Sequence, residues 1–167
     1  MFLEMTVSFI GTKGYSEHRG LLKFLVQSLT KDKDMNFYLG INEAVVNALM
    51  YGTLGPSKTR VYMRFRITPR YLAVGITSKS PGFDVRQKKE QLEKIAAQRT
   101  AAWAELMEEE IHGRGIWMML AGCSKVVYSH LGDCVVLITN IPGGHSEKCG
   151  SRLISRLFIE RRGLDET

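Results

Sequence analysis

The sequence predicts an α+β domain in which helices cover one face of a mixed, mostly antiparallel sheet. Two pairs of alternating segments, at residues 59–76 and 125–139, are each joined by a short turn and predict two antiparallel hairpins. Two longer segments with apolar residues at helical spacing precede the first hairpin and predict amphipathic helices. Helices in one part of the chain and hairpins in another favour a two-layer α/β sandwich.

The N-terminal third predicts one strand followed by two helices. Residues 1–10 alternate loosely between polar and apolar side chains, and glycines at positions 11 and 14 are expected to break this strand. Ser16 can cap the helix that follows and runs to residue 30. After a charged turn at 31–34, residues 35–51 predict a second helix, whose apolar face carries Tyr38, Ile41, Val45 and Leu49.

The rest of the chain alternates between hairpins and helical segments. Residues 59–67 alternate strictly, turn at Thr68-Pro69-Arg70, and return through 72–76. A loop at 80–84 leads into strong helix formers over 86–110, and a further apolar helix starts at residue 116. The second hairpin pairs 125–129 with 134–139, and the tail over 151–162 fits either a helix or an extra strand.

Composition indicates one globular domain and excludes several classes of protein. The chain has 167 residues, is 44% hydrophobic and carries a net charge of +6. It contains neither an apolar run long enough to span a membrane nor a signal peptide, and its three cysteines lack metal-site spacing, so we expect a cytoplasmic protein. Basic and acidic residues are interleaved, without a basic stripe that carries aromatics, so direct binding of nucleic acid is not expected.

Glu43 and Asn47 are the first candidates for chemistry. They are four residues apart in the second predicted helix, so they share one side of it, away from its apolar face. A carboxylate and a carboxamide so placed can orient a nucleophile and bind Mg²⁺, which proteins hold through one or two oxygen ligands together with phosphates. Two polar residues on the solvated side of a helix give the same pattern by chance.

The segment Asn42-Glu43-Ala44-Val45-Val46-Asn47-Ala48, with Tyr51-Gly52 after it, resembles the N box of the GHKL ATPase superfamily, which includes gyrase, histidine kinases and MutL-type proteins. The similarity is closer to bacterial anti-sigma factor serine kinases. Ser80-Pro81-Gly82-Phe83-Asp84, a long intervening segment, Gly113-Arg114-Gly115 and the last hairpin follow in that family's order, over about residues 3–140. The resemblance implies the Bergerat, or histidine kinase-like ATPase, fold.

The same resemblance implies roles for individual residues. Glu43 would be the catalytic carboxylate that orients or deprotonates the acceptor hydroxyl, and Asn47 would be the Mg²⁺ ligand. Gly113, Arg114 and Gly115 would meet the triphosphate of ATP. A glycine-flanked helix start also presents free N–H groups and the positive end of the helix dipole to phosphate. The alternative for this segment is an ordinary helix start with a surface arginine.

The first glycine box of the family, Asp-x-Gly-x-Gly, is altered in this chain. Ser78 stands at the Asp that accepts a hydrogen bond from the adenine amino group, Ser80 stands at the first Gly, and Gly82 retains the last. A serine hydroxyl is a weaker acceptor than a carboxylate. We therefore expect Ser78 and Gly82 to belong to the nucleotide site, with weakened binding of adenine or a pocket that has drifted toward another base or none. The family's arginine for the γ-phosphate has no clear counterpart.

These features predict an ATPase domain at residues 1–142, with a lid at about 85–112, and a C-terminal extension at 143–167. The lid segment carries an apolar stripe that includes Trp103, and an acidic cluster at 108–110. It fits either an amphipathic helix packed on the domain or a partner-binding surface. The extension is compatible with a role in forming a homodimer.

The resemblance implies a serine/threonine protein kinase with ATP and Mg²⁺ as cofactors. Such a protein would sequester a sigma factor and phosphorylate a serine of an anti-anti-sigma antagonist of the STAS type. A non-catalytic interaction module on the same fold, with lost or weakened nucleotide binding, is the alternative that Ser78 and Ser80 favour. A slow ATPase that needs only water as acceptor is a third possibility.

Overall fold

A computed structural model of the chain describes residues 2–31, 35–98, 114–141 and 154–160. The elements follow in the order β1 (Leu3–Ile10), α1 (Gly11–Thr30), α2 (Asn36–Met50), β2 (Arg60–Ile67), β3 (Tyr71–Ser78), α3 (Val85–Gln98), α5 (Arg114–Gly122), β4 (Lys125–Tyr128), β5 (Cys134–Asn140) and β6 (Leu157–Ile159). None of these helices combines the length and the apolar character that a membrane span requires.

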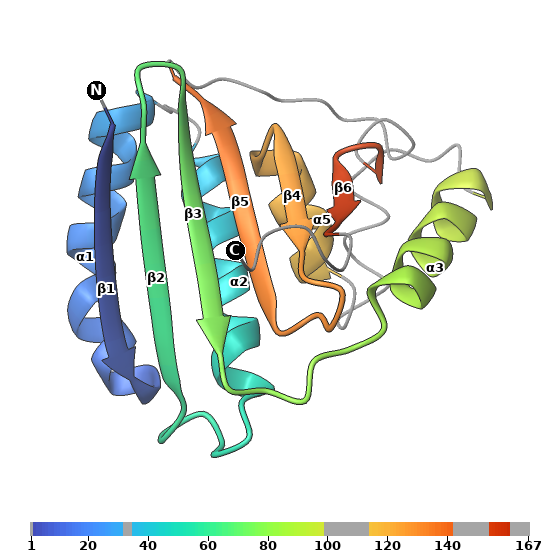
Figure 1. Ribbon diagram of the computed structural model, residues 1–167, viewed down its shortest axis with the longest axis horizontal. Helices are drawn as coiled ribbons and strands as arrows, with labels where there is room; N and C mark the ends of the chain where they lie inside the picture. Colours follow the sequence, from blue (N-terminus) through green and yellow to red (C-terminus); the bar gives the residue numbers. More distant parts are fainter. Residues whose placement is uncertain (1, 32–34, 99–113, 142–153, 161–167) are drawn as a thin grey trace, which may run out of the picture.

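The strands form one six-stranded sheet in the order β1-β2-β3-β5-β4-β6. Neighbouring strands are antiparallel except β4 and β6, which are parallel. Helices α1, α2 and α5 lie together behind the sheet, and α3 lies beyond β6 at the sheet's edge (Figure 1). The predicted α+β sandwich with helices on one face of a mixed sheet is therefore confirmed.

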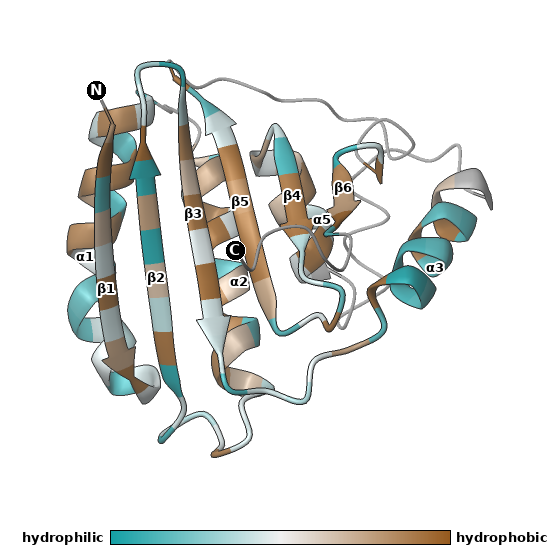
Figure 2. Cartoon of the chain, viewed as in Figure 1, coloured by the Kyte–Doolittle hydropathy of each residue, from teal (hydrophilic) through white to brown (hydrophobic). Residues whose placement is uncertain are grey.

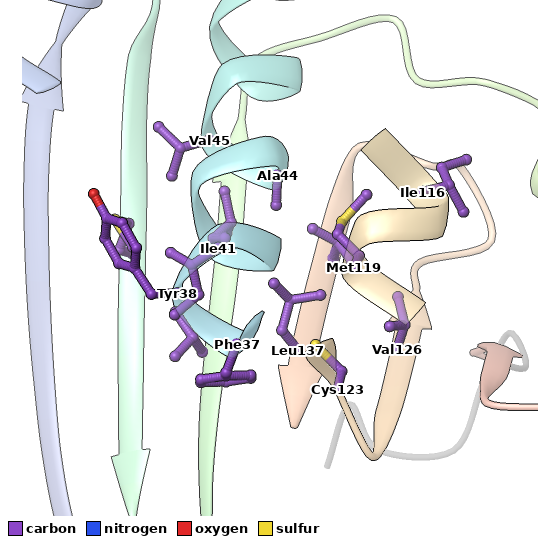
Figure 3. Packing of buried hydrophobic residues seen from close by; sticks show 14 of the residues in the cluster. Phe37, Tyr38, Ile41, Ala44, Val45, Ile116, Met119, Cys123, Val126 and Leu137 are labelled. Carbon is purple, nitrogen blue, oxygen red and sulfur yellow. The ribbon is translucent and has the colours of Figure 1, made fainter. Parts of the chain in front are cut away.

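The core lies between the sheet and the helices that cover it. Strand β2 shows the pattern most clearly, because Val61, Met63 and Phe65 are fully buried while the residues that alternate with them, Arg60, Tyr62, Arg64 and Arg66, are exposed. Figure 2 shows this alternation as bands along β2. The predicted apolar face of α2 is buried as expected, and Figure 3 shows two of its residues, Tyr38 and Val45, on the side of the helix that points away from α5.

Helix α1 begins earlier than its sequence predicts. We expected Gly11 and Gly14 to break the chain and Ser16 to cap the helix, but the helix starts at Gly11 directly after β1. The backbone N–H groups of Gly11 and Thr12 donate to the carbonyls of Thr59 and Pro56, at 2.9 and 3.1 Å. A distant loop thus satisfies the first N–H groups of the helix, so no side-chain cap is needed.

Helix α3 begins at Val85 because Asp84 caps it. One carboxylate oxygen of Asp84 accepts hydrogen bonds from the backbone N–H groups of Arg86 and Gln87, each at 3.0 Å. The helix is described as far as Gln98. The remainder of the predicted lid helix, including Trp103 and the acidic cluster, lies outside the described residues.

The sequence leaves a helix and a strand equally open for the tail, and residues 157–159 form a strand. Strand β6 pairs with β4 at the edge of the sheet. Just before it, the Arg156 guanidinium donates to the carbonyls of Leu120 and Cys123 at 3.2 and 3.0 Å. A cation at the C-terminal end of α5 complements the helix dipole and its free carbonyls, and so ties the tail to the domain.

Candidate functional site

Glu43 and Asn47 lie where the sequence predicts, one turn apart on α2. Both side chains are partly exposed, whereas Ile41 and Val45 on the core face of the same helix are fully buried. The two polar side chains therefore face away from the sheet core but not into open solvent. A second element must cover them in part.

That element is α5, which packs antiparallel against α2 through glycines. Gly122 lies against the backbone of Asn36, and a Cβ on Gly40 would lie 3.3 Å from the Cα of Met119. Since neither glycine has a side chain, the two helix backbones approach closely. Continuing this alignment by about two helical turns brings the first turn of α5 alongside the polar residues of α2.

Gly115 is the residue of α5 that meets this polar pair. A Cβ built on it would lie 3.2 Å from Asn47 Nδ2 and 3.3 Å from Glu43 Oε2. A carboxylate, a carboxamide and the N-terminal turn of a helix thus converge at one place. Arg114 is the first residue of α5, but its side chain and the whole of Gly113 lie outside the described residues.

A polar network between α1 and α2 supports the turn that carries Glu43. The Tyr15 hydroxyl donates to Asn42 Oδ1 at 3.0 Å, and the Arg19 Nε donates to the Tyr38 hydroxyl at 3.1 Å. Burial is the main cause that raises the pKa of Tyr15 well above its usual range, so the ring keeps its proton. Sequence reasoning missed this network, because Tyr15 and Asn42 are 27 residues apart and neither position carries a local signal of the contact.

Ser78 is placed at the end of β3, beside α2. Its hydroxyl donates to the carbonyl of Ala48 at 3.1 Å, and the residue is only 6% exposed. The residue that accepts this hydrogen bond, Ala48, directly follows Asn47 on α2, so Ser78 adjoins the candidate site. Its hydrogen is directed to the helix backbone, so the hydroxyl can offer a ligand only the lone pairs of an uncharged oxygen.

Gly82 contacts the turn between β4 and β5. Its φ is +70°, and a Cβ on it would collide with the carbonyl oxygen of Leu131. The next residue, Phe83, donates its backbone N–H to the same oxygen at 3.0 Å. Packing against the Leu131 carbonyl therefore explains why this position needs glycine. The predicted contact of Gly82 with a nucleotide stays a prediction.

The residues that converge on Gly115 fit a magnesium-bound phosphate. The side chains of Glu43 and Asn47 offer the hard oxygen ligands that Mg²⁺ prefers. The missing side chain of Gly115 leaves its backbone approachable, and the N-terminal turn of a helix is in general a favourable site for phosphate. Asn47 would hold the cation, and the first turn of α5 would hold phosphate oxygens.

Comparison with known proteins gives the family. None of the curated proteins with which the chain was compared matches it. The family model of the histidine kinase-like ATPase domain matches residues 21–139, a range that runs from within α1 almost to the end of β5 and includes every candidate site residue. Domains of this type bind ATP, typically with Mg²⁺. The chain belongs to the histidine kinase-like ATPase domain family.

Proposed function

We propose that this chain is an anti-sigma-factor-type regulator with serine/threonine protein kinase activity. It binds Mg-ATP, sequesters a sigma factor, and phosphorylates a serine of an anti-anti-sigma antagonist of the STAS type. The observation that carries the proposal is the convergence of Glu43 and Asn47 on Gly115, at the N-terminal turn of α5. The resemblance of the segment around these residues to the N box of anti-sigma factor kinases supports the choice of acceptor and partners.

Each residue of the site has a distinct task in this proposal. When bound, Mg-ATP would supply the γ-phosphoryl group, whose bond to the β-phosphate breaks so that ADP leaves. Asn47 binds the cation through its amide oxygen, and the backbone of Gly115 donates toward phosphate oxygens. Glu43 accepts a hydrogen bond from the serine hydroxyl of the acceptor and takes up its proton as the oxygen attacks. Phosphorylation of the antagonist then releases it, and the sigma factor is held instead.

Two variants separate binding from chemistry. Asn47→Ala should weaken Mg-ATP binding at least tenfold in calorimetry, because it removes the amide oxygen from the cation. Glu43→Gln should bind Mg-ATP within about threefold of the native chain but lose transfer of radiolabelled phosphate to a STAS-type antagonist by at least a hundredfold, in the usual range for a catalytic base. Glu17→Gln, on the exposed side of α1, is the matched control and should change neither quantity. No binding of Mg-ATP to the native chain at millimolar concentration would exclude the kinase.

The hydrogen bond from Ser78 to Ala48 favours a second candidate, a non-catalytic interaction module on the same fold. With the hydroxyl directed to the protein and no carboxylate at this position, the adenine amino group loses its charged acceptor. In that case the chain regulates its sigma factor or antagonist by binding alone. Phosphotransfer to an antagonist that disappears in Glu43→Gln would rule out this candidate.

A further inference from the structure

The face of the sheet opposite α1, α2 and α5 is uncovered by helices in the part of the chain that the structure describes (Figure 1). Strand β2 presents Arg60, Tyr62, Arg64 and Arg66 on this face, in alternation with its buried residues. Sequence reasoning found no basic stripe with an aromatic residue, because the arginines are separated by apolar residues along the chain. Strand geometry places them side by side.

The register of the sheet arranges this face in rows, one of which has a cation at each end. One row crosses four strands as Arg66, Ala73, Ile138 and Lys125, so a cation stands at each end of two aliphatic residues. The neighbouring row contains Arg64, Gly75, Val136 and Val127. We call the middle of these rows the open trough; it consists of Ala73, Gly75, Val136 and Ile138, all partly exposed.

Gly75 is the residue that points to an occupant of the open trough. It lies in the middle of a central strand, where glycine weakens a sheet. Its φ is not in the left-handed region, and an added Cβ would meet only Arg64 O and Val136 Cγ2, both at 3.9 Å, which is ordinary contact. The fold therefore does not require glycine here. A missing side chain in a strand also marks places where another molecule approaches closely.

We propose that the open trough binds an acidic amphipathic helix of a partner protein. Strands β2 and β4 are three spacings apart in the sheet, about 14 Å. A helix with its side chains is roughly 10–12 Å across, so it fits between Arg64 and Arg66 on one side and Lys125 on the other. Its apolar side would rest on the aliphatic residues, and acidic residues on its flanks would meet the cations. This surface is separate from Glu43 and does not depend on the kinase proposal.

Two other occupants fit the observations less well. Single-stranded nucleic acid needs a series of free aromatic faces, but Arg66 covers the ring of Phe2 and Lys125 covers that of Phe158, at 5.8 and 4.3 Å. The exposed ring of Tyr62 lies on β2, outside the open trough. A second copy of the chain would set cations against cations, because both sides of the open trough are basic. Three acids adjoin this face in the described ranges: Glu4, which is paired with Arg66 at 2.8 Å, Asp133 in the turn before β5, and Glu160 after β6.

The test uses labelled probes and fluorescence anisotropy on the full chain. The probe is a helical 20-residue peptide with leucines on one side and glutamates on both flanks. Its controls are the same peptide with lysine flanks and a 15-nucleotide oligothymidine. The acidic peptide should bind, more weakly at higher salt, and at least tenfold more tightly than either control. Tighter binding of the oligothymidine, or equal binding of the lysine peptide, would overturn the proposal.

Variants place the binding on the open trough. Arg64→Glu should weaken binding of the acidic peptide at least tenfold. Lys13→Glu, the same change of charge sign on the exposed side of α1, should change the affinity for this peptide less than twofold. Gly75→Val should also weaken binding of the acidic peptide at least tenfold, while the chain stays folded and binds Mg-ATP as before. Unchanged peptide binding in Gly75→Val, or dimerisation of the native chain in sedimentation that Gly75→Val abolishes, would refute the assigned occupant.

Discussion

Asn47 and Gly115 lie in contact across the interface of α2 and α5: a Cβ on the glycine would stand 3.2 Å from the amide nitrogen. Gly115→Ala should therefore crowd the cation ligand and lower Mg-ATP affinity about tenfold, or about 1.4 kcal/mol. The stability of the apo protein should not fall by the same amount, since alanine favours helix over glycine by up to about 1 kcal/mol.

Gly20→Ala is the matched control for this change, because Gly20 lies on α1 with nothing within 4 Å of its added Cβ. It should stabilise the chain in urea denaturation by about 0.5–1 kcal/mol and leave nucleotide binding unchanged. Equal nucleotide affinity in the native chain and in Gly115→Ala would show that the phosphates do not lie at this glycine.

Ser78→Asp restores the residue that the family's first glycine box carries. The carboxylate cannot donate to the Ala48 carbonyl, so the apo protein should lose about 1–3 kcal/mol in urea denaturation. If the adenine amino group lies at this position, affinity for ATP should rise relative to GTP, as measured by calorimetry. The comparison variant Ser78→Ala removes the hydroxyl without adding charge. A large loss of ATP affinity in Ser78→Ala would mean that the serine hydroxyl itself binds the base.

The N box shows how far the sequence predicts this site. Helical spacing alone places Glu43 and Asn47 together, and the resemblance brings Gly115 to the same site. The sequence does not predict that Gly40 and Gly122 set the alignment of α2 and α5, because a close helix contact depends on the partner backbone. The start of α1 was wrong for a similar reason, since the carbonyls that accept from Gly11 and Thr12 come from residues more than 40 positions later.

The strands were predicted well because their alternation records which face is buried. The grouping of charge on the opposite face is less visible in the sequence: Arg60, Arg64 and Arg66 alternate with apolar residues along the chain but share one face of β2. Periodicity shows which residues share a face of one element. It does not show which elements leave a face uncovered, since that depends on the arrangement of the helices.

Gly82→Ala should destabilise the chain strongly. Alanine there combines an unfavourable φ of +70° with a collision against the Leu131 carbonyl, so we expect a loss of more than about 3 kcal/mol. Gly55 has a φ of +78° but open space around its Cβ, so Gly55→Ala isolates the cost of φ, about 1–2 kcal/mol. Urea denaturation of both variants measures the difference. Equal losses would show that the loop at Gly82 moves freely away from the β4–β5 turn.

Alkaline pH should unfold this protein progressively, because three buried groups keep their protons in the fold. Burial is the main cause that raises the pKa of Cys123, Tyr15 and Tyr128 above the usual values of 9.0 for the thiol and 10.0 for the phenols. A raised folded-state pKa means that the unfolded chain ionises first. Stability should thus be constant below about pH 9 and then fall, by about 1.4 kcal/mol per pH unit for each group that is ionised only in the unfolded chain.

Tyr128→Phe tests this account with little structural change, since the Tyr128 hydroxyl donates only a weak bond, 3.7 Å long, to the Met119 sulfur. The variant should match the native chain closely at pH 7. Above pH 10 its free energy of unfolding, from urea denaturation at several pH values, should fall less steeply by about 1.4 kcal/mol per pH unit. An unchanged slope would mean that Tyr128 ionises equally in the folded and unfolded chains, which its burial makes energetically unfavourable.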